Sequence, residues 1–204
     1  SIFGSYKGFE YTFNVMEGLN SEKFTPAGAI RGGRKKGYMA DATDLMYTLR
    51  ADYNVSSALK AGASVTYNKA RGDSSTIEFN LIELHAKYNK NGLHAVAEGA
   101  MINYNRGPVE SSTGYYFDLG YDVNRLIKSD WQIIPFVRYS FYNTASAVRN
   151  TALISDSFAY TQIMIGVNIL PLENVVLKAD FSSKKRKSND EETKSFNLGI
   201  GYMF

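Results

Sequence analysis

Every second residue of the segment 196–204 is large and apolar, whereas Asn197, Gly199 and Gly201 between them are small or polar. In an extended strand successive side chains point to opposite faces, so this segment presents one continuous apolar stripe. The period of two predicts a β-strand here and excludes an amphipathic helix. The apolar stripe consists of Phe196, Leu198, Ile200, Tyr202 and Phe204.

The same period recurs along the chain in about ten segments that are separated by turn residues. We expect strands over residues 7–17, 44–55, 59–70, 76–90, 93–105, 114–124, 131–143, 160–170, 175–184 and 194–204. Long and short connections alternate, and this alternation is typical of an outer-membrane barrel, with short periplasmic turns and long extracellular loops. The sequence therefore predicts an all-β fold, an antiparallel transmembrane β-barrel, as a single domain over residues 1–204.

One of these segments breaks the alternation. In 76–90 the residues Ile77 and Phe79 share one phase, whereas Leu84 and Ala86 share the other. An extra residue in one strand reverses the faces of all residues beyond it, so we expect a β-bulge near Leu81.

Composition and motifs exclude several function classes. The chain has 204 residues, a net charge of +3 and no cysteine. The balanced charge disfavours nucleic acid as a partner, and the missing thiols exclude thiolate metal sites. No cofactor or metal site is expected. The two histidines, His85 and His94, lie within expected strands. The sequence contains neither a nucleophile-elbow motif nor a zinc-protease helix motif, so we do not expect the chain to be an enzyme.

Alternation alone does not say which face is inside, because a soluble β-barrel buries its apolar face. The order of residues along the stripes favours a membrane: in 44–55, Tyr47 and Tyr53 flank Leu49 and Ala51. Aromatic rings at strand ends with aliphatic residues between them resemble two interfacial girdles around a hydrocarbon band.

The terminal stripe, closed by Phe204 with Tyr202 two residues before it, resembles the assembly signal of bacterial outer-membrane porins. The segment from Gly18 to Arg34, with the downstream strands, is similar to the superfamily that contains the phosphate-selective porins. This resemblance implies a Gram-negative outer membrane, recognition by the barrel assembly machinery, a homotrimer, and basic residues along an anion path. Porins of that superfamily have 16 strands, so the chain also fits the C-terminal portion of a larger barrel.

The polar face supplies candidate pore-lining residues: Arg50, Asp52, Lys60, Asp118, Asp122, Arg138, Lys178 and Asp180. A charge on the lipid face near the midplane costs about 2–4 kcal/mol, so these side chains need water or partners. Two roles remain open for them, ion pairs that hold the wall together and a transverse field across a pore.

Two basic clusters lie in connections. Residues 184–187 are expected on the outer rim, against lipopolysaccharide phosphates. The longest connection contains a second cluster, which becomes a constriction if the connection folds into the mouth. Its members are Arg31, Arg34, Lys35 and Lys36.

These observations predict a porin in the cell outer membrane, with passive diffusion of small hydrophilic solutes or ions and a weak preference for anions. Two alternatives remain open. The first is a structural or adhesive outer-membrane barrel that acts through its extracellular loops, and the second is a soluble β-barrel binding protein.

Overall fold

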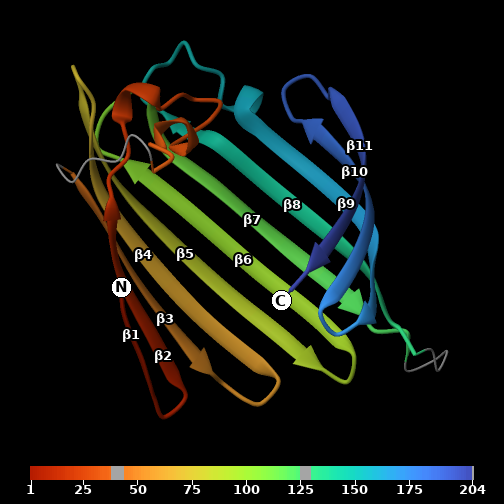
Figure 1. Ribbon diagram of the computed structural model, residues 1–204. Coiled ribbons are helices and arrows are strands. Elements are labelled where there is room, and N and C mark those ends of the chain that lie inside the picture. The colour runs from red at the N-terminus through yellow and green to blue at the C-terminus, as the bar shows by residue number, and fades with distance from the viewer. Residues whose placement is uncertain (38–43, 125–129, 204) are drawn as a thin grey trace.

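The computed structural model, which describes residues 1–37, 44–124 and 130–203, is one antiparallel sheet of eleven strands (Figure 1). Each strand pairs with its neighbours in sequence, so the order is a simple meander. The strands are β1 Ile2–Tyr6, β2 Phe9–Glu17, β3 Leu45–Asn54, β4 Leu59–Arg71, β5 Thr76–Lys90, β6 Leu93–Tyr104, β7 Val109–Tyr121, β8 Gln132–Val148, β9 Ala159–Leu172, β10 Val175–Arg186 and β11 Glu192–Tyr202. In the connections, the described residues form three short 3₁₀ helices, η1 Ser21–Lys23, η2 Arg31–Gly33 and η3 Ser155–Phe158.

A short N-terminal hairpin adds one strand to the ten that the alternation predicts. Lys7 and Gly8 both have positive φ, 47° and 87°, and join β1 to β2 in a tight turn. Two central residues with positive φ give the turn twist that suits a two-residue hairpin. Asn91 and Gly92, at 55° and 80°, make the same kind of turn between β5 and β6.

The two ends of the sheet differ. We name the end that carries the connections 18–44 and 149–158 the loop end, and the opposite end the turn end. The turn end carries the hairpin turns at 7–8, 91–92 and 173–174. The loop end also has short connections, over 72–75 and 105–108, and the turn end has a longer one, over 122–131. The expected strict alternation of long and short connections is therefore wrong, and the asymmetry is set mainly by the connection 18–44.

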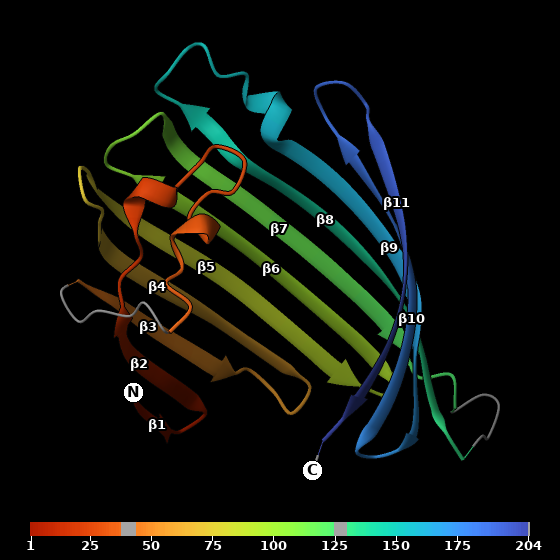
Figure 2. The same ribbon diagram turned by 45° about the horizontal axis from the view of Figure 1, so that its top comes forward.

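The sheet is strongly curved, and the segment 18–37 lies over its concave face at the loop end (Figures 1 and 2). β1 and β11 are its two edges and are not paired with each other. Both are odd-numbered strands of a meander, so they run in the same direction. Among the described residues, no helix is long and apolar enough to cross a membrane.

The convex face is apolar and exposed. Leu84 is 62% exposed, Ile165 54% and Leu198 74%, and similar side chains cover this face on most strands. Aromatic pairs lie toward both strand ends, with Phe9 and Tyr53 4.4 Å apart between ring centroids and Phe13 and Tyr47 6.5 Å apart. The large apolar side chains of the sheet therefore lie mainly on its convex face.

The expected β-bulge in β5 is wrong. The register of β5 with β4 and with β6 runs without a shift past Leu81 and Ile82. Phe79 is 1% exposed and lies on the concave face, whereas Ile82 is 50% exposed on the convex face. The apolar residues change from one face of β5 to the other because only the loop end of its concave face is covered. There the segment 18–37 packs over it.

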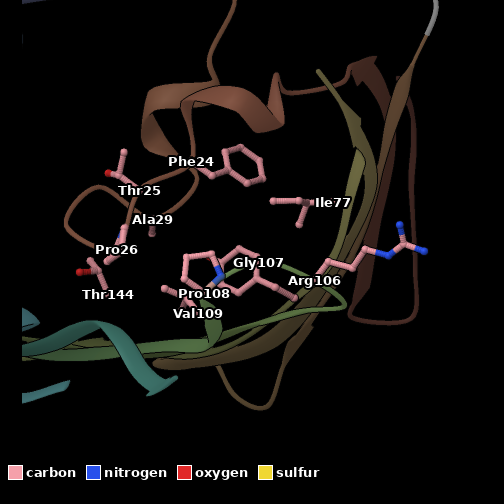
Figure 3. A pocket seen from close by; sticks show the side chains of 11 residues that line it. Phe24, Thr25, Pro26, Ala29, Ile77, Arg106, Gly107, Pro108, Val109 and Thr144 are labelled. Atoms are coloured by element: carbon pink, nitrogen blue, oxygen red, sulfur yellow. The ribbon is translucent and has the colours of Figure 1, made fainter. Parts of the chain in front are cut away.

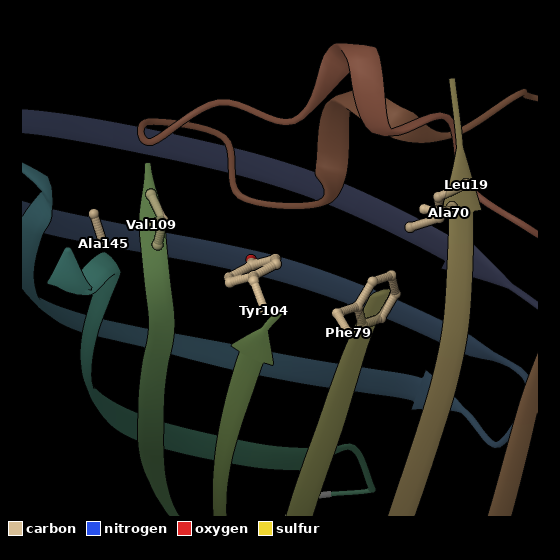
Figure 4. Close-up of a cluster of buried hydrophobic side chains, with 6 residues drawn as sticks. All are labelled: Leu19, Ala70, Phe79, Tyr104, Val109 and Ala145. Carbon is tan, nitrogen blue, oxygen red and sulfur yellow. The ribbon is translucent and has the colours of Figure 1, made fainter. Parts of the chain in front are cut away.

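The buried apolar core is small and lies under that segment. Figure 4 shows Ala70, Phe79, Tyr104, Val109 and Ala145 at one level on neighbouring strands. Leu19 completes the cluster from the connection itself. The core therefore joins the infolded segment to the wall and does not fill the concave face along its length.

Candidate functional site

The charged candidates gather on the concave face. Successive opposed residues form a row across the sheet, Asp52, Gly62, His85, Glu98, Tyr116, Ser140, Gln162 and Lys184. His85 shares its face of β5 with Phe79, which packs against Phe24 of the infolded segment at 6.1 Å between ring centroids. The row therefore lies on the side that this segment covers.

Arg50 and Asp52 belong to a network with two residues of β5. Arg50 Nε donates to Asp52 Oδ2 at 2.8 Å, two positions along the same strand. His85 Nε2 lies 2.6 Å from Asp52 Oδ1, and its Nδ1 lies 2.6 Å from Glu83 Oε1. Ser64 donates its hydroxyl proton to the other oxygen of Glu83. The side chains of Asp52, His85 and Glu83 are only about a tenth exposed, so this network stiffens the wall.

Arg138 and Asp118 form a second network. They face each other directly on β8 and β7, and Arg138 donates from Nε and Nη2 to both oxygens of Asp118. The guanidinium lies over the Tyr116 ring, 4.8 Å from its centroid. Tyr116 donates its hydroxyl proton to Glu98 at 2.8 Å. A bidentate pair of this kind is held in one orientation.

The other candidates are also paired. Lys60 Nζ lies 2.6 Å from Glu10 Oε2, and Lys178 Nζ lies 3.6 Å from Asp180 Oδ2. Asn197 on β11 donates to Asp180 at 2.8 Å. Asp122 lies beyond the end of β7, where it accepts a hydrogen bond from Gln132 at 2.9 Å. It therefore helps to hold the turn end together.

A carboxylate ties the infolded segment to the wall. Glu22 Oε1 accepts hydrogen bonds from the backbone N–H and the hydroxyl of both Ser74 and Ser75, at 2.8 to 3.1 Å. The hydrogen bond from the Ser74 N–H is the largest cause that holds the pKa of Glu22 below its ordinary value of 4.5. A side chain at Gly72 would collide with Glu22, so glycine leaves the space for this contact.

Apolar and amide contacts add to this tether. The Phe24 ring packs edge-on against Phe79 and Tyr104, with centroids 6.1 and 6.4 Å apart. The Leu19 N–H donates to the fully buried Asn68 side chain at 2.9 Å. Ring pairs of this geometry each add about 0.5–1.5 kcal/mol beyond area burial.

A small cavity of about 40 Å³ remains beneath the segment, lined by residues that include Phe24, Pro26, Ile77, Val109 and Thr144 (Figure 3). The Arg106 side chain extends away from it (Figure 3). This volume admits about three waters at most, since one water needs about 10–15 Å³ by this measure. The segment is thus packed closely onto the wall, and the cavity is too small for a solute.

The basic cluster of this segment begins at η2. Arg31, Arg34 and Lys36 are exposed, and Lys35 is half-buried. Gly32 approaches the carbonyl of Lys23 too closely for any side chain, and Asn20 N–H donates to Gly33 O at 2.9 Å. η1 and η2 therefore pack together, and the exposed cations are carried on a segment that lies over the concave face.

Sequence reasoning missed Glu10, Glu83, His85 and Glu98 as residues of this face. The period-two pattern contains the signal for these residues, since His85 lies between Leu84 and Ala86, whose side chains point to the opposite face. A histidine suggests a catalytic group from the sequence, whereas the structure places His85 between two carboxylates. Across residues 1–37, 44–124 and 130–203, no three His, Asp or Glu side chains form a metal-binding group.

The terminal stripe lies on the convex face of β11. Phe196, Leu198, Ile200 and Tyr202 are 63% to 77% exposed. Phe204, the fifth residue of the expected assembly signal, lies outside the described residues.

Comparisons with known proteins identify the fold. No family model and no curated protein matches the chain. The anion-selective porin from Comamonas acidovorans superimposes with a TM-score of 0.67 at 15% identity, over 99% of this chain and 58% of its own. A porin refined at 1.8 Å superimposes with a TM-score of 0.59 at 11% identity, over 99% of this chain and 60% of its own. The chain has the porin fold and spans less than two thirds of these porins' lengths.

Proposed function

We propose that this chain forms the wall of an outer-membrane channel for passive diffusion of small hydrophilic solutes and ions. The observation that carries the proposal is the inverted distribution of side chains. Charged networks line the concave face, whereas large apolar side chains cover the convex face. Charges need water and apolar surface needs lipid, and a membrane barrel supplies both.

The same observation disfavours a soluble β-barrel binding protein. A soluble barrel places its large apolar side chains in a core, and its exposed apolar patches rarely exceed a few hundred Å². Burying one large apolar side chain contributes about 1.5–3 kcal/mol of folding free energy. In water, each exposed apolar side chain of the convex face would lose this contribution. Ile82, Phe117 and Ile165, each at least half exposed, belong to that face.

We also propose that the channel weakly prefers anions. The wall charges are largely paired with each other, so their long-range fields nearly cancel. The cluster of Arg31, Arg34, Lys35 and Lys36 adds positive charge on a segment that lies over the concave face. An aqueous passage with excess positive charge concentrates anions. One porin of the same fold is described as anion-selective, which agrees with this direction.

The membrane and assembly partners are also proposals. We place the convex face in outer-membrane lipid, the loop end toward lipopolysaccharide, and the terminal stripe against the barrel assembly machinery. A homotrimer is the assembly that the porin resemblance implies. The cluster 184–187 has ion pairs of its own, such as Arg186 with Glu191 at 3.1 Å, which weakens its attraction for lipopolysaccharide.

The test is conductance of the purified intact protein in a planar bilayer. We expect stepwise channel insertion and a reversal potential across a KCl gradient that indicates mild anion preference. Changing Arg31, Arg34, Lys35 and Lys36 together to Gln should abolish that preference, and the parent's preference should fade with salt because the Debye length is about 10 Å at 0.1 M. Absence of conductance would favour the adhesive barrel, and an unchanged reversal potential in the variant would remove the cluster from the permeation path.

A further inference from the structure

The concave face has a hollow of about 270 Å³ where β6, β7 and β8 carry small residues. Its floor includes Ala100, Gly114 and Ser140, and the rings of Tyr116 and Tyr142 lie along it. Gly114 lies directly opposite both Ala100 and Tyr142, so the shallow floor spans three adjacent strands. Pockets for drug-sized ligands begin at about 300 Å³, so a solute with a single ring matches this volume.

Two cations lie over tyrosine rings that line this hollow. Lys184 Nζ lies 5.3 Å from the Tyr142 ring centroid and 4.2 Å from that of Tyr160. The two tyrosine rings are themselves stacked, 5.2 Å apart and tilted by 26°. Arg138 lies over Tyr116 on the other side. The lining of the hollow therefore contains the Tyr116 and Tyr142 rings, the Arg138 guanidinium and, on β6, the Glu98 carboxylate that accepts the Tyr116 hydroxyl proton. Lys184 lies at its border toward β10, over the Tyr142 ring and away from Glu98.

The two cations differ in what neutralises them. Arg138 is held by both oxygens of Asp118. Within the part of the chain that the structure describes, no carboxylate forms an ion pair with Lys184, which is held by ring faces alone. A cation–π contact leaves the ammonium N–H groups available on the side away from the rings. Lys184 can therefore donate to an anion that arrives beside Tyr142.

We propose that this hollow is a binding subsite for aromatic carboxylates, a deeper inference that rests on the channel function proposed above. The solute ring packs against Tyr142 over the small floor residues, and its carboxylate accepts hydrogen bonds from Lys184. Ser140 is directly opposite Gln162 in the register, and Gln162 is directly opposite Lys184, so residues with further donor groups follow the same row.

The experiment measures block of chloride conductance by benzoate through the intact protein in planar bilayers, with acetate as the anion that lacks a ring. We expect benzoate to reduce the chloride current at concentrations at which acetate does not. Tyr142→Ala should weaken the benzoate block about fivefold, because one ring contact is lost, whereas Tyr142→Phe should retain it. Lys184→Gln should also weaken it about fivefold, and Lys184→Arg should preserve it.

Lys87→Gln is the matched control, since Lys87 lies on the same face of β5 as His85, opposite Lys60 and outside the lining of the hollow. It should leave the benzoate block unchanged. Equal block by benzoate and acetate, or full block in Tyr142→Ala, would overturn the subsite while open channels still support the channel function. Channels that never conduct chloride would overturn the channel proposal itself.

Discussion

At the scale of single residues, the polar groups of this chain act mainly by holding positions. One oxygen of Glu22 accepts four hydrogen bonds from Ser74 and Ser75, and thereby joins the infolded segment to the connection between β4 and β5. His85 is clamped between Asp52 and Glu83 in the same way. Charged groups with this many partners are held in fixed positions and set the shape of the concave face.

The Glu22 tether predicts a response to acid. Its pKa is lowered by the serine hydrogen bonds, so its stabilisation is fully present above 4.5 and is lost as the pH falls through the lowered pKa. We expect the Ser74 and Ser75 amides to be protected from hydrogen exchange at neutral pH and to lose protection at lower pH than an ordinary glutamate would require. Glu22→Gln should weaken this protection at neutral pH and remove the acid step. Identical protection at pH 7 and in strong acid, after correction for intrinsic exchange, would contradict the tether.

At the scale of elements, β5 shows how one strand serves two surroundings. Its first half directs Phe79 beneath the infolded segment, and its second half directs Ile82 and Leu84 outward. A reader of the sequence sees two apolar phases and infers a bulge. The register has no shift, because Phe79 faces the infolded segment on the concave side, whereas Ile82 and Leu84 face the surroundings of the convex side.

The connections between elements predict sidedness in cells. Ser188 lies in the exposed connection between β10 and β11 at the loop end, and Ser57 lies in the exposed turn between β3 and β4. With the loop end outside, Ser188→Cys should react with a membrane-impermeant maleimide on intact cells, and Ser57→Cys should react only after the outer membrane is opened. Labelling of Ser57→Cys alone on intact cells would reverse the orientation.

At the scale of the whole molecule, the two faces of one sheet have opposite requirements. The concave face carries ion pairs that need water or each other, and the convex face carries apolar groups that need lipid. The sheet edges β1 and β11 add a third requirement, because unpaired backbone groups are costly in hydrocarbon. The two faces support the proposed placement in a membrane, where the backbone groups of both edges need partners.

β9 offers a matched test of these faces. Ile165 is 54% exposed on the convex side, whereas Asn168 lies opposite Lys178 on the concave side. Ile165→Arg should destabilise the folded protein in lipid vesicles by about 2–4 kcal/mol, because it places a charge in hydrocarbon. Asn168→Arg should change the free energy of unfolding much less. Equal effects in a urea titration would show that the convex face is not in lipid.

Much of the fold follows from alternation and turn residues in the sequence. The period of two predicts ten strands, with bounds up to five residues from those observed, as at the start of β7 and the end of β8. It also places Arg50, Asp52, Arg138 and Asp180 on one face, because side-chain direction in a strand is a local property. The alternation does not predict the N-terminal hairpin because β1 has only five residues and its turn, Lys7-Gly8, falls at the start of the segment 7–17 that is expected as a strand.

Only the tertiary structure decided which charges meet and where the long segment lies. The pair of Lys60 with Glu10 spans β2 to β4, and the contact of Glu22 with Ser74 joins residues 52 positions apart. Such partners depend on register, curvature and packing, which no local pattern contains. Alternation determined the two faces of this protein, and the covering of Phe79 by Phe24 decided which part of the concave face is closed.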